Sequence, residues 1–253
     1  MIQDNKEHLL RKRLQELASM AYYKKILTYT DFLNLNEISI FHSMGNELLF
    51  DRYQLYGGYK GAERQILFFT GDESFDSLKD FISCIHIVPL NKKFSDKLTH
   101  RDFLGAILNL GIQRGKIGDI LTRDREGYVF CDKNISEFII SNLTKIKHTN
   151  VKCILLDSDS PVLEPNFINI YGSISSNRLD SLIAVAMKTS RSSVSGLISG
   201  GKVFVNSKVI LSNSYLVKDD EIISIRGYGK YIYKGVQSQT KKGKLRVLLL
   251  KYD

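Results

Sequence analysis

The sequence has few of the residues and runs that mark several protein classes. It has three prolines, no tryptophan and no low-complexity tract, which argues against long disordered segments. No apolar run approaches the roughly 18 to 20 residues that span a bilayer. The opening MIQDNKEHLLRKRLQEL is charged throughout and lacks the apolar core of a secretory signal. We therefore expect a cytoplasmic protein with no membrane anchor.

The cysteines form neither a disulfide framework nor a recurrent zinc motif. Cys84, Cys131 and Cys153 are odd in number and widely spaced, and no CxxC pair exists. His86 and His148 complete no recurrent metal-ligand spacing. We expect buried or half-buried reduced thiols, and no metal or other cofactor.

The positive charge of the chain is unevenly distributed. Residues 172–253 contain 14 lysines and arginines against 5 aspartates and glutamates, a net charge of +9. Residues 1–171 contain 22 residues of each sign, so the net charge of +9 lies wholly in the C-terminal third. Such asymmetry favours a phosphate-bearing partner. An anionic membrane face is the alternative, but it would favour a basic amphipathic helix, and many of these charges occur in strand-like or turn-like sequence.

The first 75 residues are predicted to form a small α+β domain. Apolar positions at helical spacing indicate a helix over 7–28, and Thr30-Asp31 could cap a second helix that ends near Ser43. Leu48–Tyr56 and Gln65–Thr70 are predicted strands, joined by a glycine-rich hairpin.

Residues 76–160 are predicted to form a second domain with a β-α-β-β-α-β order. That order is typical of ferredoxin-like and RRM-type folds. Thr99 is a plausible N-cap for the first helix, with Asp102 as its capping-box partner. The predicted elements are Ile82–Pro89, Thr99–Leu110, Lys116–Thr122, Tyr128–Asp132, Ile135–Ile146 and Val151–Leu156. Asp157–Asn166 contains two of the three prolines and is the best linker candidate.

Residues 172–253 are predicted to form the third domain, so the fold class is α+β with three small domains. Two short helices are expected at Arg178–Lys188 and Ser190–Ser199. Short strands are expected at Lys202–Asn206, Glu221–Arg226, Lys230–Gly235 and Leu245–Lys251.

The third domain contains the most informative motif. Its residues are Arg178-Leu179-Asp180, Ser190-Arg191, Leu197-Ile198, Gly201–Asn206, Asp219-Asp220 and Arg226-Gly227. The pattern resembles the S4 domain, an RNA-binding module. The candidate RNA-binding residues are Arg178, Leu179, Asp180, Lys188, Ser190, Arg191, Ser192, Gly201, Lys202, Val203, Asn206 and Lys208.

The physical properties of this stretch agree with the resemblance. Ser190 can cap the second helix, whose free N–H groups bind phosphate readily. The guanidinium of Arg191 can donate two parallel hydrogen bonds to phosphate oxygens. Lys202, Asn206 and Lys208 follow on a tight turn and could line the same face. A structural interpretation fits other residues better: the apolar positions, Leu179 and Val203 among them, belong to the core, and Asp180 is better placed to orient Arg178 than to touch RNA. For the basic tail over 241–246, a solvated hairpin tip and a phosphate contact remain equally open.

The upstream sequence resembles a particular family. The segments are GGYKGAER at 57–64, LTHRDFLGA at 98–106, LGI at 110–112 and KIGDI at 116–120. They are similar to the YlmH family of bacterial proteins over nearly the full length. The resemblance implies a ribosome-associated RNA binder with an RRM-like middle domain, tied to quality control on stalled large subunits that carry peptidyl-tRNA. It also implies genes placed among cell-division genes, which leaves a division-site scaffold as a weaker possibility.

An RNA-modifying enzyme is the main rival, because S4 domains often accompany enzymes. The only Arg-Leu-Asp, at 178–180, already belongs to the S4 motif and is not followed by the Thr-Ser-Gly of pseudouridine synthases. No cofactor loop of a methyltransferase and no HIGH-like or KMSKS-like segment is present. His100-Arg101-Asp102 suits a helix cap better than a catalytic site. Arg101, Arg114 and Lys116 could instead give the central domain a second RNA surface.

We therefore expect a non-enzymatic, monomeric protein that binds structured ribosomal RNA, with tRNA and the large subunit as further partners. An rRNA-modifying enzyme with an unrecognised site is the alternative.

Overall fold

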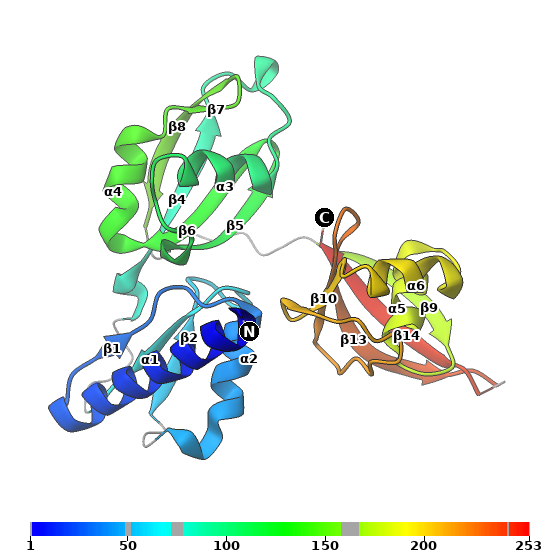
Figure 1. Cartoon of the computed structure of the whole chain (residues 1–253). Coiled ribbons are helices and arrows are strands. Elements are labelled where there is room, and N and C mark those ends of the chain that lie inside the picture. The colour runs from blue at the N-terminus through cyan, green and yellow to red at the C-terminus, as the bar shows by residue number, and fades with distance from the viewer. Residues whose placement is uncertain (1, 49–51, 72–77, 158–166, 242, 253) are drawn as a thin grey trace. The chain divides into compact units, whose positions relative to one another are not determined.

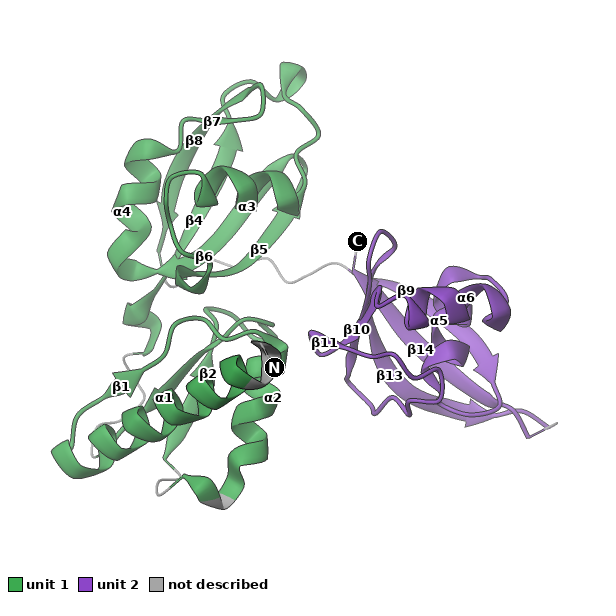
Figure 2. Ribbon diagram, viewed as in Figure 1, with its two compact units in different colours: residues 1–164 green, residues 165–253 purple. Residues whose placement is uncertain are grey.

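The computed structural model describes residues 2–48, 52–71, 78–157, 167–241 and 243–252. The chain forms two compact units, residues 1–164 and residues 165–253 (Figure 2). Most of the proposed linker, residues 158–166, lies outside the described residues. Among the described residues, no helix combines the length and the apolar character that crossing a bilayer requires.

The N-terminal part of unit 1 packs two helices on a small antiparallel sheet (Figure 1). All four residues of the central strand β3 are buried, so this strand forms the centre of the local core. The sheet order is β1-β3-β2, and β2 and β3 form the predicted hairpin. The elements are α1 (Ile2–Lys24), β1 (Thr28–Tyr29), α2 (Leu35–Met44), β2 (Tyr53–Tyr56) and β3 (Ile66–Phe69).

Two helix boundaries differ from the prediction. The first helix ends at Lys24, because the following residues turn to place Thr28–Tyr29 beside β3. The second helix is capped by Asn34, not by Thr30-Asp31: the Asn34 side chain accepts from the backbone N–H of Glu37, and the Glu37 side chain accepts from that of Asn34. Thr30 was the wrong cap because its hydroxyl accepts a hydrogen bond from the backbone N–H of Leu67 in the sheet.

The central part of unit 1 has the predicted β-α-β-β-α-β order. Its sheet runs β5-β6-β4-β8-β7 and every pair is antiparallel, the arrangement expected of a ferredoxin-like fold. The capping box of Thr99 and Asp102 is present at the start of α3. The elements are β4 (Ile82–Pro89), α3 (His100–Leu108), β5 (Ile117–Arg123), β6 (Glu126–Asp132), α4 (Lys133–Asn142), β7 (Lys145–Ile146) and β8 (Thr149–Leu156). Short 3-10 helices occupy Gly45–Glu47, Leu78–Phe81, Lys92–Phe94 and Arg114–Lys116.

The predicted helix over 135–146 is wrong at its C-terminal end. The helix stops at Asn142, and Lys145–Ile146 pairs with Thr149–Asn150 in a tight hairpin. Ile146 is buried in the hairpin just as it would be on a helix face, so hydrophobic spacing could not separate the two structures. The cysteines are free thiols as expected, and burial raises the pKa of Cys84 to about 12 and that of Cys153 to about 11.

Unit 2 is a two-layer structure in which α5 and α6 cover one face of a six-stranded antiparallel sheet (Figure 1). The strand order is β11-β10-β12-β13-β14-β9. The edge strand β9 was not predicted, although it pairs with β14 over eight residues. The elements are β9 (Phe167–Ile174), α5 (Leu179–Met187), α6 (Arg191–Ser199), β10 (Val203–Val205), β11 (Lys208–Val209), β12 (Ile222–Ile225), β13 (Gly229–Gln239) and β14 (Leu245–Tyr252).

Candidate nucleic-acid interface

The start of α5 is held against the loop that precedes β12. The backbone N–H of Leu179 donates to Tyr215 O at 2.8 Å, and that of Asp180 donates to Asn213 O at 3.3 Å. Leu179 is 0% exposed, so it positions the helix and cannot contact RNA directly. The local core therefore fixes where Arg178 and Asp180 lie.

Asp180 joins the starts of the two helices. Its carboxylate accepts hydrogen bonds from Arg178 at 3.2 and 3.3 Å, from the Ser181 hydroxyl at 3.2 Å and from Arg191 at 2.5 Å. Burial alone would raise the pKa of Asp180, but the hydrogen bonds and positive charges of the two arginines lower it below its usual value. The Asp180 side chain is 8% exposed, whereas those of Arg178 and Arg191 are 35% and 55% exposed. We call these three residues the arginine clamp; its net charge is positive and it presents two anchored guanidinium groups to solvent.

The start of α6 lies directly beside the clamp. The Ser190 side chain accepts from the backbone N–H of Ser193 at 3.3 Å, as its N-cap position predicts. The hydroxyls of Ser192 and Ser193 each lie 2.8 Å from the Ser190 hydroxyl, and all three residues are exposed. Lys188 turns the chain between the helices with a positive φ of 52° and is also exposed. Exposed N–H groups, hydroxyls and cations together suit a phosphate.

The segment after α6 is a tight β-turn between short strands. Gly201 has a φ of +64°, which favours glycine, and Asn206 and Ser207 both have positive φ in the two-residue connection between β10 and β11. Asn206 accepts from the backbone N–H of Ile222 at 2.9 Å, so its amide holds the turn to β12. Val203 is 0% exposed and belongs to the core.

Lys202 and Lys208 do not share a face of this ribbon, contrary to expectation. Lys208 pairs with Val205, whose side chain is buried in the core of unit 2, and directly paired residues project to the same side. Lys202 alternates with Val203 and therefore projects with Phe204 to the other side. The prediction was wrong because it relied on closeness in sequence, whereas the strand pairing decides the side.

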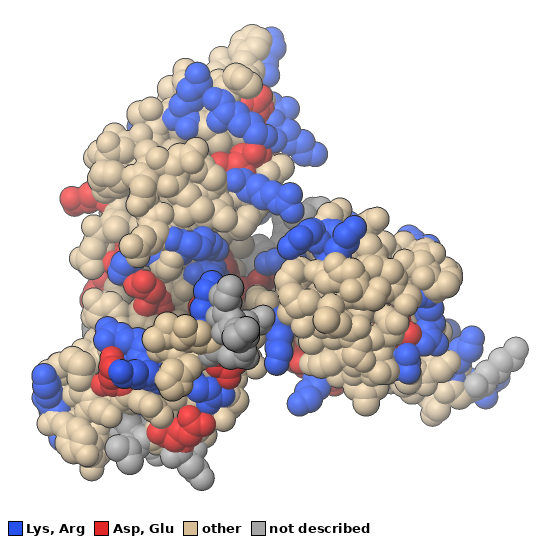
Figure 3. All heavy atoms as spheres, in the orientation of Figure 1, with Lys and Arg blue, Asp and Glu red and all other residues tan. Residues whose placement is uncertain are grey.

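Unit 2 brings most of the predicted polar residues to its surface. The exposed members are Lys188, Ser190, Arg191, Ser192, Lys202 and Lys208, while Arg178, Gly201 and Asn206 are half-buried. Leu179, Asp180 and Val203 are buried and act by positioning the others. In Figure 3, lysine and arginine dominate the charged atoms on the visible face of unit 2, whereas unit 1 mixes both signs. We call the exposed and half-buried set, with Asp180, the S4 face.

Two of the three cations predicted as a second RNA surface are instead bound within unit 1. Arg114 donates to Gly118 O at 3.4 Å and also to Ile117 O, and burial followed by the positive charge of Arg64 lowers its pKa to about 10. Lys116 bridges Asp31 at 2.9 Å and Asp132 at 3.0 Å. The hydrogen bond to Asp31, helped by that to Asp132, raises the pKa of Lys116 to about 12 although burial opposes it. Lys116 therefore helps to join the two parts of unit 1 through Asp31, whereas Arg114 is held within the central part.

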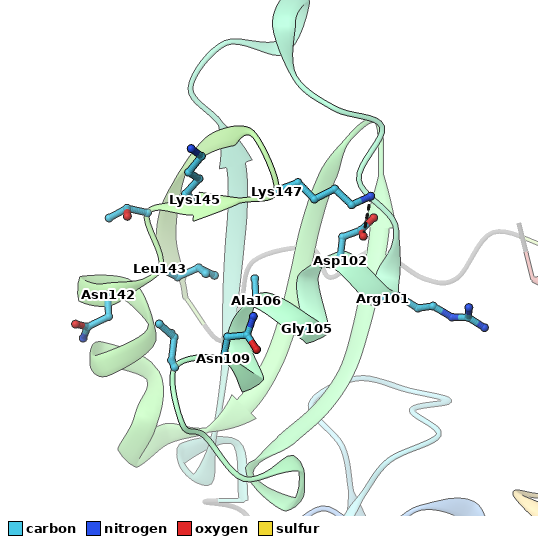
Figure 4. Close-up of a pocket in the computed structure, with 11 residues that line it drawn as sticks. Arg101, Asp102, Gly105, Ala106, Asn109, Asn142, Leu143, Lys145 and Lys147 are labelled. Carbon is cyan, nitrogen blue, oxygen red and sulfur yellow. Dashed lines mark ion pairs between the residues drawn. The ribbon is translucent and has the colours of Figure 1, made fainter.

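Arg101 lies at a different place, beside a shallow groove between α3 and the β7–β8 hairpin (Figure 4). The cavity measures about 510 Å³, and its lining includes Lys145 and Lys147. Lys147 pairs with Asp102 at 2.8 Å, and the hydrogen bond from Lys147, with those from Thr99, lowers the pKa of Asp102 to about 2. The two lysines were missed because the sequence pattern placed Lys145 at the end of a helix and Lys147 just after it, and did not predict a hairpin beside α3.

Comparisons with known proteins match both units. Residues 77–159 match a family model described as "Putative RNA-binding domain in YlmH", and residues 177–223 match the S4 domain. The chain is 32% identical over 202 residues to the Ribosome-associated protein quality control protein P2 of Bacillus subtilis (strain 168), a match that covers 76% of this chain and 74% of that protein. The chain belongs to the YlmH family.

A solved structure shares the fold. The YlmH-family chain described here is similar to the Cell division protein ylmH from Streptococcus pneumoniae, with a TM-score of 0.51 and 19% identity, over 64% of this chain and 96% of that one. All residues of the S4 face fall inside the range that matches the S4 domain. Strands β9, β13 and β14 of this YlmH-family protein lie outside both matched ranges.

Proposed function

We propose that this protein docks structured ribosomal RNA through the S4 face, as a quality-control factor that acts on stalled large subunits without catalysing a reaction on the RNA. The arginine clamp is the observation that carries the proposal. A buried carboxylate holds two arginines from successive helices in place, so less side-chain freedom is lost when they bind a phosphate.

The distribution of charge supports RNA as the partner. The net charge of +9 lies in residues 172–253, the same region that forms the S4 face. Contacts to phosphates and 2′-hydroxyls read the shape of folded RNA more than its sequence, which suits a rigid clamp beside a helix start. The name of the Bacillus subtilis relative supports the assignment to ribosome-associated quality control. Contact with tRNA belongs to the same proposal.

Co-sedimentation with ribosomal fractions tests the docking. The informative variant is Lys188→Glu with Lys202→Glu, because both lysines are exposed, whereas Arg191→Glu would place a second carboxylate against Asp180. Lys12→Glu with Lys24→Glu is the matched control, since it makes the same change of charge on exposed positions of α1. We expect the first variant to leave the ribosomal fractions and the control to remain there. Equal retention of both would contradict the proposal.

The non-enzymatic part of the proposal has a separate test. Mapping of modified nucleotides in the ribosomal RNA of a deletion strain should give the same map as the parent strain. A lost modification would replace the proposal with the rival function of an RNA-modifying enzyme.

A further inference from the structure

The sheet of unit 2 has a second face, away from α5 and α6. Residues alternate between faces along each strand, and directly paired residues share a face. The side that carries the core is defined by residues such as Val203, Ile225, Tyr231 and Leu249. Their neighbours along the strands project to the other side, which we call the outer face.

A row of aromatic and cationic side chains crosses the outer face. Phe167 pairs with Tyr252, and their ring centroids lie 5.0 Å apart in an edge-to-face arrangement. The Lys230 ammonium lies 5.9 Å from the centroid of Tyr252. Lys230 in turn pairs with Ser224, and Ser224 with Phe204. The pairing therefore makes one continuous row from the edge strand β9 to β10.

The row ends on a second cation–aromatic pair. The Arg226 guanidinium lies 5.8 Å from the centroid of the Phe204 ring. Arg226 donates its backbone N–H to Lys202 O, so the row reaches a residue of the S4 face. Aromatic rings and arginine guanidinium groups are both side chains on which nucleobases stack.

Tyr171 lies on the same face of β9 as Phe167 and is far more open. It pairs with Leu248 and is 69% exposed, against 38% for Phe167. The glycine next to it, Gly172, faces α5, where an added Cβ would lie 2.3 Å from Val185. Packing of β9 on α5 thus fixes Tyr171 with its ring outward, although no requirement of the core explains an aromatic residue there.

The charge of the six strands indicates the kind of partner. None of their residues is an aspartate or a glutamate, and Lys230 and Arg246 project to the outer face with Ser224 and Ser173. Lys208 and Lys251 project to the core side with Val205 and Tyr231, and Lys234 pairs with Asp220 of the loop before β12. An apolar face free of carboxylates and flanked by cations is complementary to a polyanion that also offers flat apolar groups. Unpaired RNA has both properties, because its bases are flat and every nucleotide carries a phosphate.

We infer that the outer face of unit 2 binds unpaired RNA bases, with Tyr171 and Phe167 as stacking residues and Lys230 and Arg246 as phosphate contacts. This site meets the S4 face at Lys202, but its stacking residues and its phosphate contacts lie outside the S4 face, and it can exist whether or not the S4 face docks ribosomal RNA. Folded RNA with a loop or a flipped base could engage both faces at once.

Binding of a short fluorescent oligouridylate to the full-length protein, followed by fluorescence anisotropy, tests the inference. Loss of one base–aromatic stack weakens binding by about tenfold, so Tyr171→Ala and Phe167→Ala should each show a loss of that order. Tyr171→Phe keeps a stacking ring and should bind within about twofold of the parent protein. Tyr23→Ala is the matched control, because Tyr23 is a 72% exposed aromatic residue of α1 and lies outside both ranges that match RNA-binding families.

The same variants on an RNA duplex of equal length separate stacking from charge. A duplex hides its base faces, so Tyr171→Ala should leave duplex binding unchanged. The variant Lys188→Glu distinguishes the two sites, because we expect it to weaken ribosome association while Tyr171-dependent oligouridylate binding persists. The inference is overturned if Tyr171→Ala and Phe167→Ala both bind oligouridylate like the parent protein while their melting temperatures stay normal. It is also overturned if they lose a protein partner and keep RNA binding.

Discussion

The guanidinium of Arg191, at the start of α6, donates to Asp180 Oδ2 at 2.5 Å, next to the start of α5. Arg178 donates to the same oxygen at 3.2 Å. One buried carboxylate thus holds the cations of two successive helices. Arg191 is exposed and Arg178 is half-buried, so the clamp can serve both the fold and a phosphate.

Replacement of the shared carboxylate should weaken the fold of unit 2. Asp180→Asn removes the charge that both arginines contact and keeps the size of the side chain. We expect unfolding of unit 2 to become easier by about 1–3 kcal/mol, the range for a missing charge-assisted hydrogen bond in a buried setting. Calorimetry of the full chain measures this loss of stability. An unchanged unfolding transition of unit 2 would contradict the role of the clamp.

The same substitution should have a pH-dependent effect. The folded pKa of Asp180 lies below its unfolded value of about 3.9, so the ionised group stabilises unit 2 above that pH. This contribution is lost as the pH falls through the lowered folded pKa. The difference in melting temperature between the parent protein and Asp180→Asn should therefore be full at neutral pH and shrink in acid. If this difference in melting temperature grew in acid, the protonated form of Asp180 would be the one that stabilises unit 2.

Replacement of the Asp119 carboxylate should destabilise unit 1 and leave the stability of unit 2 unchanged. Asp119 on β5 accepts from the Tyr59 hydroxyl at 2.8 Å and from the backbone N–H groups of Glu63 and Arg64 at 2.7 and 3.2 Å. Asp119→Ala leaves these donors without their acceptor, and we expect a loss of about 2–4 kcal/mol in unit 1. The unit 2 transition in the same calorimetric scan is the internal control. Oligouridylate binding should also persist.

Two glycines of unit 2 should respond in opposite directions to alanine. Gly172→Ala would place a Cβ 2.3 Å from Val185, so we expect a destabilisation of about 1–3 kcal/mol. Gly196 lies in α6, and an added Cβ would have no heavy atom within 4 Å apart from the local backbone of its own helix, so Gly196→Ala should stabilise by about 0.5–1 kcal/mol. Urea denaturation measures both. If Gly172→Ala were neutral, β9 would not pack on α5 as described.

The salt dependence of RNA binding should report individual lysine–phosphate interactions. Removing one such interaction makes the log-log slope of affinity against salt concentration shallower by about 0.7–0.9. Lys188→Ala and Lys202→Ala should therefore each flatten the slope for a fragment of ribosomal RNA by roughly this amount. Lys12→Ala on α1 should leave it unchanged.

Local signals in the sequence were sufficient for much of the fold. The strand Ile82–Pro89 was predicted at its observed bounds because it is one apolar run between polar segments. The caps at Thr99 and Ser190 were also predicted, since a capping bond involves residues only three apart. Most residues of the S4 face lie close together in the chain, so they could be predicted from such local signals.

Features that depend on distant partners could not be predicted. Lys116 was given as part of a possible second RNA surface, but the carboxylates that bind it are Asp31 in the N-terminal part of unit 1 and Asp132 at the end of β6. Strand β9 was missed because β14, which pairs with it, lies more than 70 residues later in the chain. The opposite sides of Lys202 and Lys208 follow from strand register, which spacing alone does not determine.

Photocrosslinking of the protein to its bound RNA in cells, with mass spectrometry of the crosslinked peptides, tests the central claim most directly. We predict crosslinks within residues 178–208 of unit 2, on RNA that sequencing identifies as ribosomal. Crosslinks confined to unit 1, or the absence of ribosomal RNA from the crosslinked material, would contradict the account.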